Sequence, residues 1–428
     1  MSRRIALISE HASPLSALGG VDSGGQNVYV AQVGRHLARQ GYRVDVFTRR
    51  DDPSLPTVAD MGHGLRVIHV DAGPACFVPK EELLPTMDAF TAWMLDFILG
   101  QGGYELVHAN FFMSGLVAMR LKQVLGTPFA VTFHALGLVR LMHQGGVDRF
   151  PRERPRIESQ VMSAADALIA ECPQDEDDQT NLYGADPRKI HIVPCGFDSA
   201  ELWPIQRNAA RRHLGIDPED RLVVQVGRMV PRKGVDTAIE GFARLVHKYN
   251  TPARMFVVGG ESDIADPEVT PEIGRLMQIA AQEKVADRVA FTGRRDRRWL
   301  RYFYSAADVF VSTPWYEPFG ITPIEAMACG TPVIGSNVGG IKYTVQHGRT
   351  GFLVPPNDPD AVGLRLAQIY QRPSLLEAMR RRSIRRANQL FTWQRVAAEL
   401  ANVFERVLER RASKTPVSIS AWPLRTTA

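Results

Sequence analysis

Two glutamates flank a Pro-Phe-Gly turn in the segment YEPFGITPIEAMACGTP, residues 316–332. Thr322, Pro323 and Glu325 fit the start of a helix as the N-cap residue, a first-turn proline and a capping-box glutamate. Helix capping explains Glu325 but leaves Glu317 without a role. Because carboxylates accept hydrogen bonds from hydroxyl groups, Glu325 is also a candidate ligand for ribose and Glu317 for a second sugar.

Fixed positive charges stand in the segment VGRMVPRKG, where Arg228 and Lys233 follow an apolar run and lie between Gly227 and Gly234. Two cations at such a position can hold a diphosphate without a metal ion, although surface charges on a loop are the alternative. The Phe-Gly-Ile-Thr stretch at 319–322 adds the free N–H groups of a helix N-terminus, which favour phosphate as well.

Two further features of the first half could contact a ligand. Gly24 and Gly25 precede a predicted helix, where exposed N–H groups can bind an anion. His134 follows the run FAVTF, and at a strand end it can be either a core residue or a ligand. Neither GGVDSGGQ nor GRMVPRKG matches the dinucleotide or P-loop fingerprints, which argues against nicotinamide enzymes and P-loop NTPases.

The sequence indicates neither a metal site nor a disulfide framework. Asp175 and Asp177 have the spacing of a metal-bound diphosphate site, but they open a predicted helix whose dipole acidic residues complement. The cysteines lie far apart, without CxxC or Cys/His pairing, at Cys76, Cys172, Cys195 and Cys329. We therefore predict no metal and no cofactor.

These residues require a scaffold, and the pattern of apolar runs supplies one. Short β-branched runs alternate with helical patterns throughout, as in IALIS, YRVDVFT and FAVTFH of the first half and LVVQVGR, VFVST and TGFLVP of the second. Such runs are typical of parallel strands buried on both faces, so we predict two doubly wound α/β domains. In parallel sheets ligands bind beyond the carboxyl ends of the strands, and the candidate binding residues of both halves follow predicted strands. We therefore predict a ligand-binding cleft between the two domains.

A proline- and charge-rich stretch near residue 200 is the predicted linker. We expect a first domain at 1–200, a second at 201–391, an amphipathic helix at about 392–411 and a loose tail at 412–428.

Composition narrows the class of protein. The 428 residues are 45% hydrophobic and 23% charged, with no apolar run long enough to span a bilayer. The apolar stretch after the N-terminal arginines is too short for a secretion signal, so we expect a cytoplasmic protein. The net charge of +5 suits anionic substrates or an acidic membrane surface without proving either. Arginine clusters at 294–301 and 380–386 read most simply as solvated helix faces.

The motifs GGVDSGGQNVYV, TFHALG, VGRMVPRKG, FTGRRD and EPFGITPIEA together resemble those of retaining glycosyltransferases of family four, which have the GT-B fold. The last matches the family's E-x7-E motif, and the resemblance covers essentially the whole chain. It implies a C-terminal helix that crosses back onto the first domain. It also implies transfer of a hexose from a nucleotide diphosphate sugar, of the UDP-glucose or UDP-GlcNAc type, with retained configuration and no required metal.

The resemblance also implies roles for individual residues. The catalytic group is His134, Arg228, Lys233 and Glu317, with Arg228 and Lys233 on the diphosphate and His134 and Glu317 on the sugar. The donor-binding residues are Gly25, Arg294, Phe319, Gly320, Ile321, Thr322 and Glu325, with Arg294 at the nucleobase and Glu325 at the ribose. Developing charge on the leaving diphosphate would be stabilised by the cations and helix N–H groups. The leaving phosphate is the favoured base, and a double displacement through Glu317 is the older alternative.

The resemblance implies that the acceptor is a small polar carbohydrate, with or without phosphate. The predicted acceptor-binding residues are Gln26, Asn27, Lys80, Arg154 and Arg156. The Gly-Gly-Gln stretch resembles the sucrose-phosphate synthase branch, whereas the opening ISEHASPL resembles the D-inositol-3-phosphate glycosyltransferase branch. Phe111 and Ala135 stand where the inositol-phosphate enzymes use tyrosine and threonine, which puts inositol phosphate in doubt.

Other classes fit less well. A UDP-sugar epimerase on the same fold is the alternative, but it needs further acid and base groups at the sugar. A nucleic-acid binder needs aromatics among the arginine clusters, where only Trp299 and Tyr302 occur. The predicted partners are therefore a nucleotide-sugar and a small carbohydrate, without nucleic acid and with no indicated membrane contact.

Overall fold

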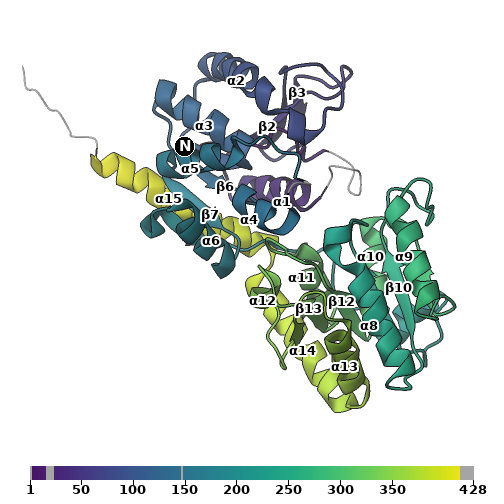
Figure 1. The fold of residues 1–428 in the computed structure, drawn as a ribbon. Coiled ribbons are helices and arrows are strands. Elements are labelled where there is room, and N and C mark those ends of the chain that lie inside the picture. Colours follow the sequence, from purple (N-terminus) through teal and green to yellow (C-terminus); the bar gives the residue numbers. More distant parts are fainter. Residues whose placement is uncertain (1, 16–23, 146–147, 415–428) are drawn as a thin grey trace, which may run out of the picture.

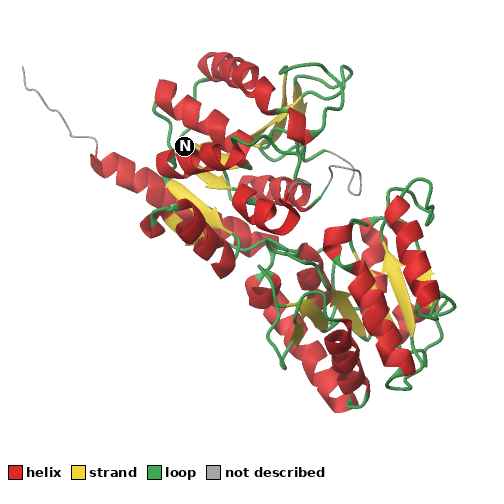
Figure 2. Cartoon of the chain, in the orientation of Figure 1, coloured by secondary structure: helices red, strands yellow, loops and turns green. Residues whose placement is uncertain are grey.

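The computed structural model describes residues 2–15, 24–145 and 148–414. These residues form two lobes, each built on a β-sheet with helices on both faces (Figures 1 and 2). The first sheet has the strand order β3-β4-β2-β1-β5-β6-β7-β8, and the second has the order β11-β10-β9-β12-β13-β14. All pairs are parallel except that between β3 and β4. The predicted fold, with two Rossmann-like units, is confirmed.

The strands of the first sheet are β1 (Arg4–Ile8), β2 (Arg43–Arg49), β3 (Val58–Asp60), β4 (Leu65–Val70), β5 (Leu106–Asn110), β6 (Phe129–Thr132), β7 (Ala167–Ala170) and β8 (Ile190–Ile192). Those of the second sheet are β9 (Leu222–Val226), β10 (Arg254–Val258), β11 (Val289–Phe291), β12 (Val309–Ser312), β13 (Val333–Ser336) and β14 (Gly351–Val354). Each apolar run named above is a strand, whereas the short β3 was not predicted.

The helices of the first lobe are α1 (Gly25–Arg39), α2 (Met87–Gln101), α3 (Phe112–Leu125), α4 (Gly137–Gln144), α5 (Arg154–Ala164) and α6 (Pro173–Tyr183). Those of the second are α7 (Arg207–His213), α8 (Val235–His247), α9 (Pro271–Gln282), α10 (Arg297–Ala306), α11 (Ile321–Ala328), α12 (Ile341–Thr344), α13 (Pro359–Tyr370) and α14 (Pro373–Leu390). The 3-10 turns are η1 (Lys80–Glu82), η2 (Leu84–Thr86), η4 (Pro187–Lys189) and η5 (Pro231–Lys233).

Alternation along the central strand β1 shows why both faces of the sheet are covered. Ile5 and Leu7 pack in one core cluster with residues of α1, and Ala6 and Ile8 pack in another with residues of α2 and α3. Successive side chains of a strand point to opposite faces, so a fully apolar strand needs helices on both. The carboxyl ends of the strands are thereby left open for ligands.

The last helix, α15 (Trp393–Lys414), returns to the first lobe and lies along it in Figure 1. Val396, Leu400 and Phe404 join the core cluster that contains α1, and Tyr42 Oη donates to Glu405 Oε1 at 3.0 Å. The crossover predicted from the resemblance is therefore confirmed. The exact domain boundaries stay predictions.

No helix in the described part of the chain combines the length and hydropathy of a membrane-spanning segment.

Candidate active site

The two lobes enclose a cleft of about 810 Å³ at the carboxyl ends of their strands. Most of the predicted site residues line it: Gly25, Gln26, Asn27, Lys80, His134, Arg228, Lys233, Arg294, Glu317, Phe319, Gly320, Ile321, Thr322 and Glu325. Arg154 and Arg156 do not line the cleft. The strand-end rule therefore brings residues from both halves of the chain to one place.

The loop after β9 carries the basic residues into the cleft. Lys233 ends the 3-10 turn η5 and donates to Glu317 Oε2, while Arg232 Nη1 lies 4.0 Å from the same oxygen. Gly234 follows with φ +61, and a Cβ there would stand 1.9 Å from the carbonyl oxygen of Thr313, so only glycine fits this turn. The turn fixes Lys233 directly opposite Glu317.

The Lys233–Glu317 pair is mostly buried, with side chains 20% and 12% exposed. Burial lowers the pKa of Lys233, although Glu317 opposes that shift. Burial alone would raise the pKa of Glu317, but Lys233 and Arg232 outweigh it and hold the pKa below its ordinary value. Glu317 is therefore an ionised acceptor facing the cleft, beside a cation that can turn to an anionic ligand.

Glu325 is buried, with 2% exposure, and its carboxylate has two partners. Tyr304 Oη donates at 2.9 Å and Arg297 Nη2 at 3.1 Å, and Arg297 Nε also donates to Glu201 at 2.8 Å. Burial raises the pKa of Tyr304, and Glu325 adds to that rise, so the phenol stays a donor. These bonds fix the carboxylate at the cleft and leave it acceptor capacity for a ligand hydroxyl.

The capping interpretation of Glu325 is wrong. Helix α11 begins at Ile321, with Gly320 as its N-cap residue at φ 89, and no side chain caps it. Glycine adopts this left-handed conformation without strain. The helix therefore begins one residue before Thr322, and its first N–H groups remain available at the cleft.

His134 is held at the end of β6 with an unusual backbone, at φ 59. Its Nδ1 lies 2.8 Å from Glu171 Oε1, and its Nε2 lies 3.1 Å from Asn110 Oδ1. Asn110 Nδ2 donates to two carbonyl groups, those of Ile8 and His108, which turns Oδ1 toward the histidine. Both ring nitrogens therefore face acceptors, and the imidazole is oriented rigidly at the cleft.

The N-terminus of α1 faces the second lobe, since a Cβ on Gly25 would lie 3.4 Å from Ile321 Cδ1. Asn27 Oδ1 accepts from Gly24 N at 3.0 Å, and Asn27 Nδ2 donates to Ser13 O at the same distance. Gln26 Nε2 donates to Ser9 Oγ and Asn110 O. These side chains shape the start of the helix, so that the N-termini of α1 and α11 open onto one cleft.

The structure places the remaining acceptor candidates differently from one another. Lys80 lines the cleft on η1 beside Glu81. Arg154 is 1% exposed and paired with Glu158, whereas Arg156 is exposed to solvent away from the cleft lining.

Several cleft residues were missed from the sequence. Glu171 directly follows β7, so the strand-end rule would have found it. Arg295 and Arg297 line the cleft beside the predicted Arg294, although the arginine cluster that contains them was interpreted as a solvated helix face. Tyr316 was missed because its contacts come from the other lobe: its ring stacks on His143 at 4.9 Å and its hydroxyl accepts from Gln144.

The Asp175-x-Asp177 spacing serves α6 rather than a ligand, since Asp175 Oδ2 accepts from the backbone of Glu171 at 2.8 Å. Burial and the neighbouring Glu171 raise the pKa of Asp175 to about 7. Within the described residues, no group of three or more His, Cys, Asp or Glu side chains is placed to hold a metal ion. Whether the reaction needs a metal stays a prediction.

Comparison with known proteins agrees with this geometry. The family model for glycosyl transferases group 1 matches residues 206–387, and that for the glycosyl transferase 4-like domain matches residues 24–196. The chain is 36% identical over 417 residues to D-inositol 3-phosphate glycosyltransferase 2 of Catenulispora acidiphila, covering 96% of each chain.

Solved structures show the same fold. Sucrose-phosphate synthase from Thermosynechococcus elongatus is similar with a TM-score of 0.86 and 33% identity, over 95% of this chain and 100% of that one. HepE of Anabaena, solved with UDP and glucose, shares the fold at a TM-score of 0.71 and 19% identity, over 94% and 100% of the two chains. The epimerase alternative finds no support in these matches. The chain belongs to the group 1 glycosyltransferases and is an enzyme of the GT-B fold.

Proposed function

We propose that this glycosyltransferase moves a hexose from a nucleotide diphosphate sugar, of the UDP-glucose or UDP-GlcNAc type, to a hydroxyl of a small polar acceptor, with retention of configuration. One observation carries the proposal. The cations of the β9 loop, Arg228 and Lys233, line the same cleft as the N-terminus of α11 and the two glutamates of the E-x7-E segment. A diphosphate, a ribose and a hexose each find a complementary group there.

The roles follow from position. Arg228 and Lys233 of the loop after β9 bind the diphosphate together with the N–H groups at the start of α11, because these positive groups line the same cleft. Glu325 accepts from the ribose, and Arg294 borders the nucleobase. Glu317, with the backbone of residues 319–321, holds the hexose, and Thr322 lies on the same helix turn.

The reaction breaks the bond between the anomeric carbon and the diphosphate oxygen and forms a bond to the acceptor oxygen on the same face. Negative charge grows on the leaving diphosphate, where Arg228 and Lys233 stabilise it more strongly than in the ground state. The acceptor proton passes to the leaving phosphate oxygen. Glu317 is bound to Lys233 and near Arg232, which favours its use as a sugar ligand over its use as a nucleophile.

The names of the relatives support a small acceptor, since one acts on D-inositol 3-phosphate and another makes sucrose phosphate. Gln26, Asn27 and Lys80 lie on the first-lobe side of the cleft, where such an acceptor would approach. His134 lines the same cleft, with its ring oriented by Glu171 and Asn110. We propose further that no metal is required, since fixed cations occupy its place, and that the enzyme is cytoplasmic.

The test is to incubate the protein with UDP-glucose, UDP-GlcNAc and GDP-mannose, with and without a panel of sugars, cyclitols and their phosphates. Released nucleotide diphosphate is measured by chromatography, and the anomeric configuration of the product by NMR. We expect slow donor hydrolysis alone and rapid release with the correct acceptor. A product with inverted configuration would contradict the proposed mechanism, and intact donors under every condition would contradict the proposed function.

A further inference from the structure

The two walls of the cleft differ in charge. We define the second-lobe wall as the cleft-lining residues from 226 onward and the first-lobe wall as those up to 195. Among its described residues, the second-lobe wall has six cationic side chains, Arg228, Arg232, Lys233, Arg294, Arg295 and Arg297, against two carboxylates, Glu317 and Glu325. The first-lobe wall has two cations, Lys80 and Arg140, against Glu81 and Glu171. Lysine and arginine therefore outnumber carboxylates on the second-lobe wall but not on the first-lobe wall.

Two undescribed segments belong to the first half of the chain and add no basic residue to this comparison. Residues 16–23 and 146–147 contain no lysine or arginine in the sequence. They cannot add positive charge to the first-lobe wall.

Arg140, a cation of the first-lobe wall, is neutralised by its own lobe. Its Nη2 donates to Asp148 Oδ1 at 2.9 Å, and its guanidinium lies over the ring of Phe150 at 5.0 Å. The Asp148 side chain is 3% exposed, so this carboxylate is committed to the pair. A phosphate at Arg140 would have to compete with an ion partner that is already in place.

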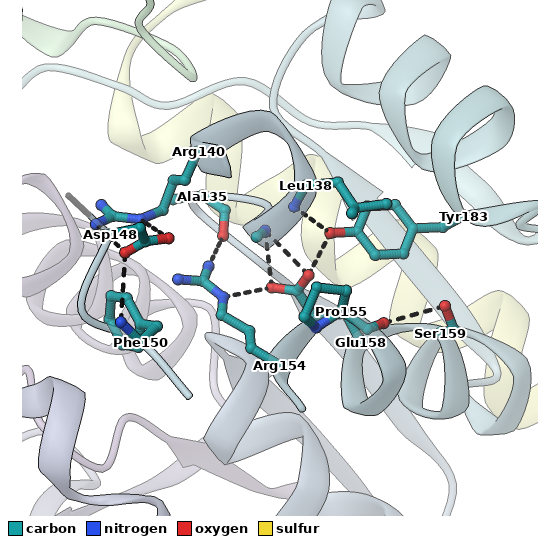
Figure 3. Close-up of polar contacts among 11 residues, drawn as sticks. Ala135, Leu138, Arg140, Asp148, Phe150, Arg154, Pro155, Glu158, Ser159 and Tyr183 are labelled. Carbon is teal, nitrogen blue, oxygen red and sulfur yellow. Dashed lines mark hydrogen bonds and ion pairs between the residues drawn. The ribbon is translucent and has the colours of Figure 1, made fainter. Parts of the chain in front are cut away.

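Arg154 lies beneath the same wall and is neutralised more completely (Figure 3). Its Nε donates to Glu158 Oε1 at 2.8 Å, and it donates through Nη2 to the carbonyl of Ala135. Glu158 also accepts from Gly137 N, at 3.0 Å and 3.1 Å, and from the hydroxyl of Tyr183. This network holds Arg154 to the start of α4 rather than presenting it to a ligand.

Aromatic rings separate Arg154 from the cleft. The centres of Phe111, Phe112 and Phe150 lie 4.8, 4.9 and 4.4 Å from its guanidinium carbon. Phe111 and Phe150 line the cleft, whereas Arg154 does not. Its Nη1 is buried and makes no hydrogen bond within the described part of the chain, so this side of the guanidinium contacts aromatic rings and not polar groups.

The backbone holds Phe111 in this position at some cost. Its φ of 89 is in the left-handed region that side chains disfavour, a strain of about 1–3 kcal/mol that surrounding contacts must offset. His11 packs edge-on against the ring at 4.9 Å, and Phe112 and Phe150 pack at 5.0 and 5.7 Å. The first-lobe wall thus presents the rings of Phe111 and Phe150 among polar side chains such as Gln26, Asn27 and Gln144, so that an uncharged ligand with hydroxyl groups can contact both kinds of surface.

From these observations we infer that the acceptor is an uncharged polyhydroxy compound, a sugar or cyclitol without phosphate, that lies against Phe111 and Phe150. The inference rests on the proposed transferase function and deepens it. Burying a phosphate against this wall would remove its hydration without supplying an uncommitted excess of cations. The C–H face of a neutral ring loses little by the same contact and buries apolar surface against the aromatic rings.

The experiment uses the donor that the assay of the proposed function identifies. It compares matched acceptor pairs: fructose with fructose 6-phosphate, glucose with glucose 6-phosphate, and myo-inositol with inositol phosphate. We expect kcat/KM for the uncharged member of the productive pair to exceed that for its phosphate by about tenfold or more. Each compound is also tested for inhibition of donor hydrolysis, so that its binding is detected even when no sugar is transferred to it.

A charge variant makes the test specific to this wall. Asp148→Asn leaves Arg140 without its carboxylate and should narrow the preference for the uncharged member by about tenfold. Asp186→Asn is the matched control, because Asp186 pairs with Arg188 at the same 2.9 Å in the same lobe but outside the cleft lining. It should leave the preference unchanged.

The outcomes separate the two levels of the proposal. Preference for the phosphorylated member in the unaltered enzyme would overturn the inference and leave the transferase function standing. The inference would also be overturned, with the transferase function still standing, if the donor is hydrolysed but no uncharged compound is glycosylated or inhibits that hydrolysis. Equal responses of Asp148→Asn and Asp186→Asn would refute the role assigned to the Arg140 pair. Donors that are never cleaved would instead refute the proposed function.

Discussion

Replacing Lys233 with alanine removes a cleft-lining cation that the proposed mechanism assigns to the departing diphosphate. Its amino group is bonded to Glu317 at rest and lies in the cleft beside the N-terminus of α11. Loss of one preorganised group of this kind costs about 3 kcal/mol of transition-state stabilisation, or about 10²-fold in kcat. We therefore expect Lys233→Ala to lower kcat by about two orders of magnitude.

The effect on folding is smaller, for a reason visible in the geometry. After the substitution Arg232 remains 4.0 Å from Glu317, and a pair at that distance still attracts by about 4 kcal/mol at an effective dielectric constant of 20. Removing one partner of a fully buried pair costs about 3–5 kcal/mol, but both side chains here keep some exposure, so we expect about 1–2 kcal/mol.

The pH dependence of that loss has a definite sign. The pKa of Glu317 is lowered in the folded protein, so its contribution to stability is present above its unfolded pKa and is lost as the pH falls through the folded value. Without Lys233 the folded pKa rises. The stability difference between the two proteins should therefore be full at neutral pH and shrink in acid.

The assay is nucleotide diphosphate release at saturating donor, with thermal unfolding measured in parallel. Lys248→Ala is the matched control, since Lys248 stands on the same lobe just after α8, pairs with Asp360 at 3.5 Å and does not line the cleft. It should retain normal turnover. A folded Lys233→Ala protein whose kcat lies within about threefold of the unaltered enzyme would refute the diphosphate role of Lys233.

Three further predictions concern other parts of the account. Glu325→Gln should raise the donor KM by about tenfold with a smaller change in kcat, since one charge-assisted bond to ribose is lost; an unchanged KM would leave Glu325 a structural role only. As the pH rises from 5 to 8, the unfolding free energy of Asp175→Asn should increase by about 2 kcal/mol relative to that of the unaltered protein. The reason is that Asp175, with a pKa of about 7, ionises in the folded protein over this range and destabilises it; a stability difference that is the same at both pH values would contradict this. Prolonged EDTA treatment should leave transfer rates unchanged, and restoration of a lost rate by added Mg²⁺ or Mn²⁺ would refute metal independence.

Much of the scaffold was predictable because parallel strands covered on both faces must be almost wholly apolar. The runs around Leu222–Val226 and Val309–Ser312 carry that signal plainly. The strand β3, three residues long and at the sheet edge, lacks it. Its pairing with β4 depends on a neighbour rather than on its own sequence.

The candidate site was predictable where a residue lies within two positions of a strand end, as for Arg228 and His134. Glu171 obeys the same rule, since it directly follows β7, but it was not predicted. The start of α11 could not be read from Thr322, because the left-handed Gly320 is the N-cap residue and the helix begins at Ile321. The aromatic cover of Arg154 was out of reach, since Phe111 and Phe150 meet it only through the tertiary fold.

The central claim is that a nucleotide-sugar lies between the lobes with its diphosphate against Arg228 and Lys233. A crystal structure of the enzyme with the donor that the transfer assay selects, or with its nucleotide diphosphate, tests this most directly. We expect the diphosphate oxygens within hydrogen-bonding distance of Arg228, Lys233 and the first N–H groups of α11. A diphosphate bound outside the cleft, out of reach of both side chains, would contradict the claim.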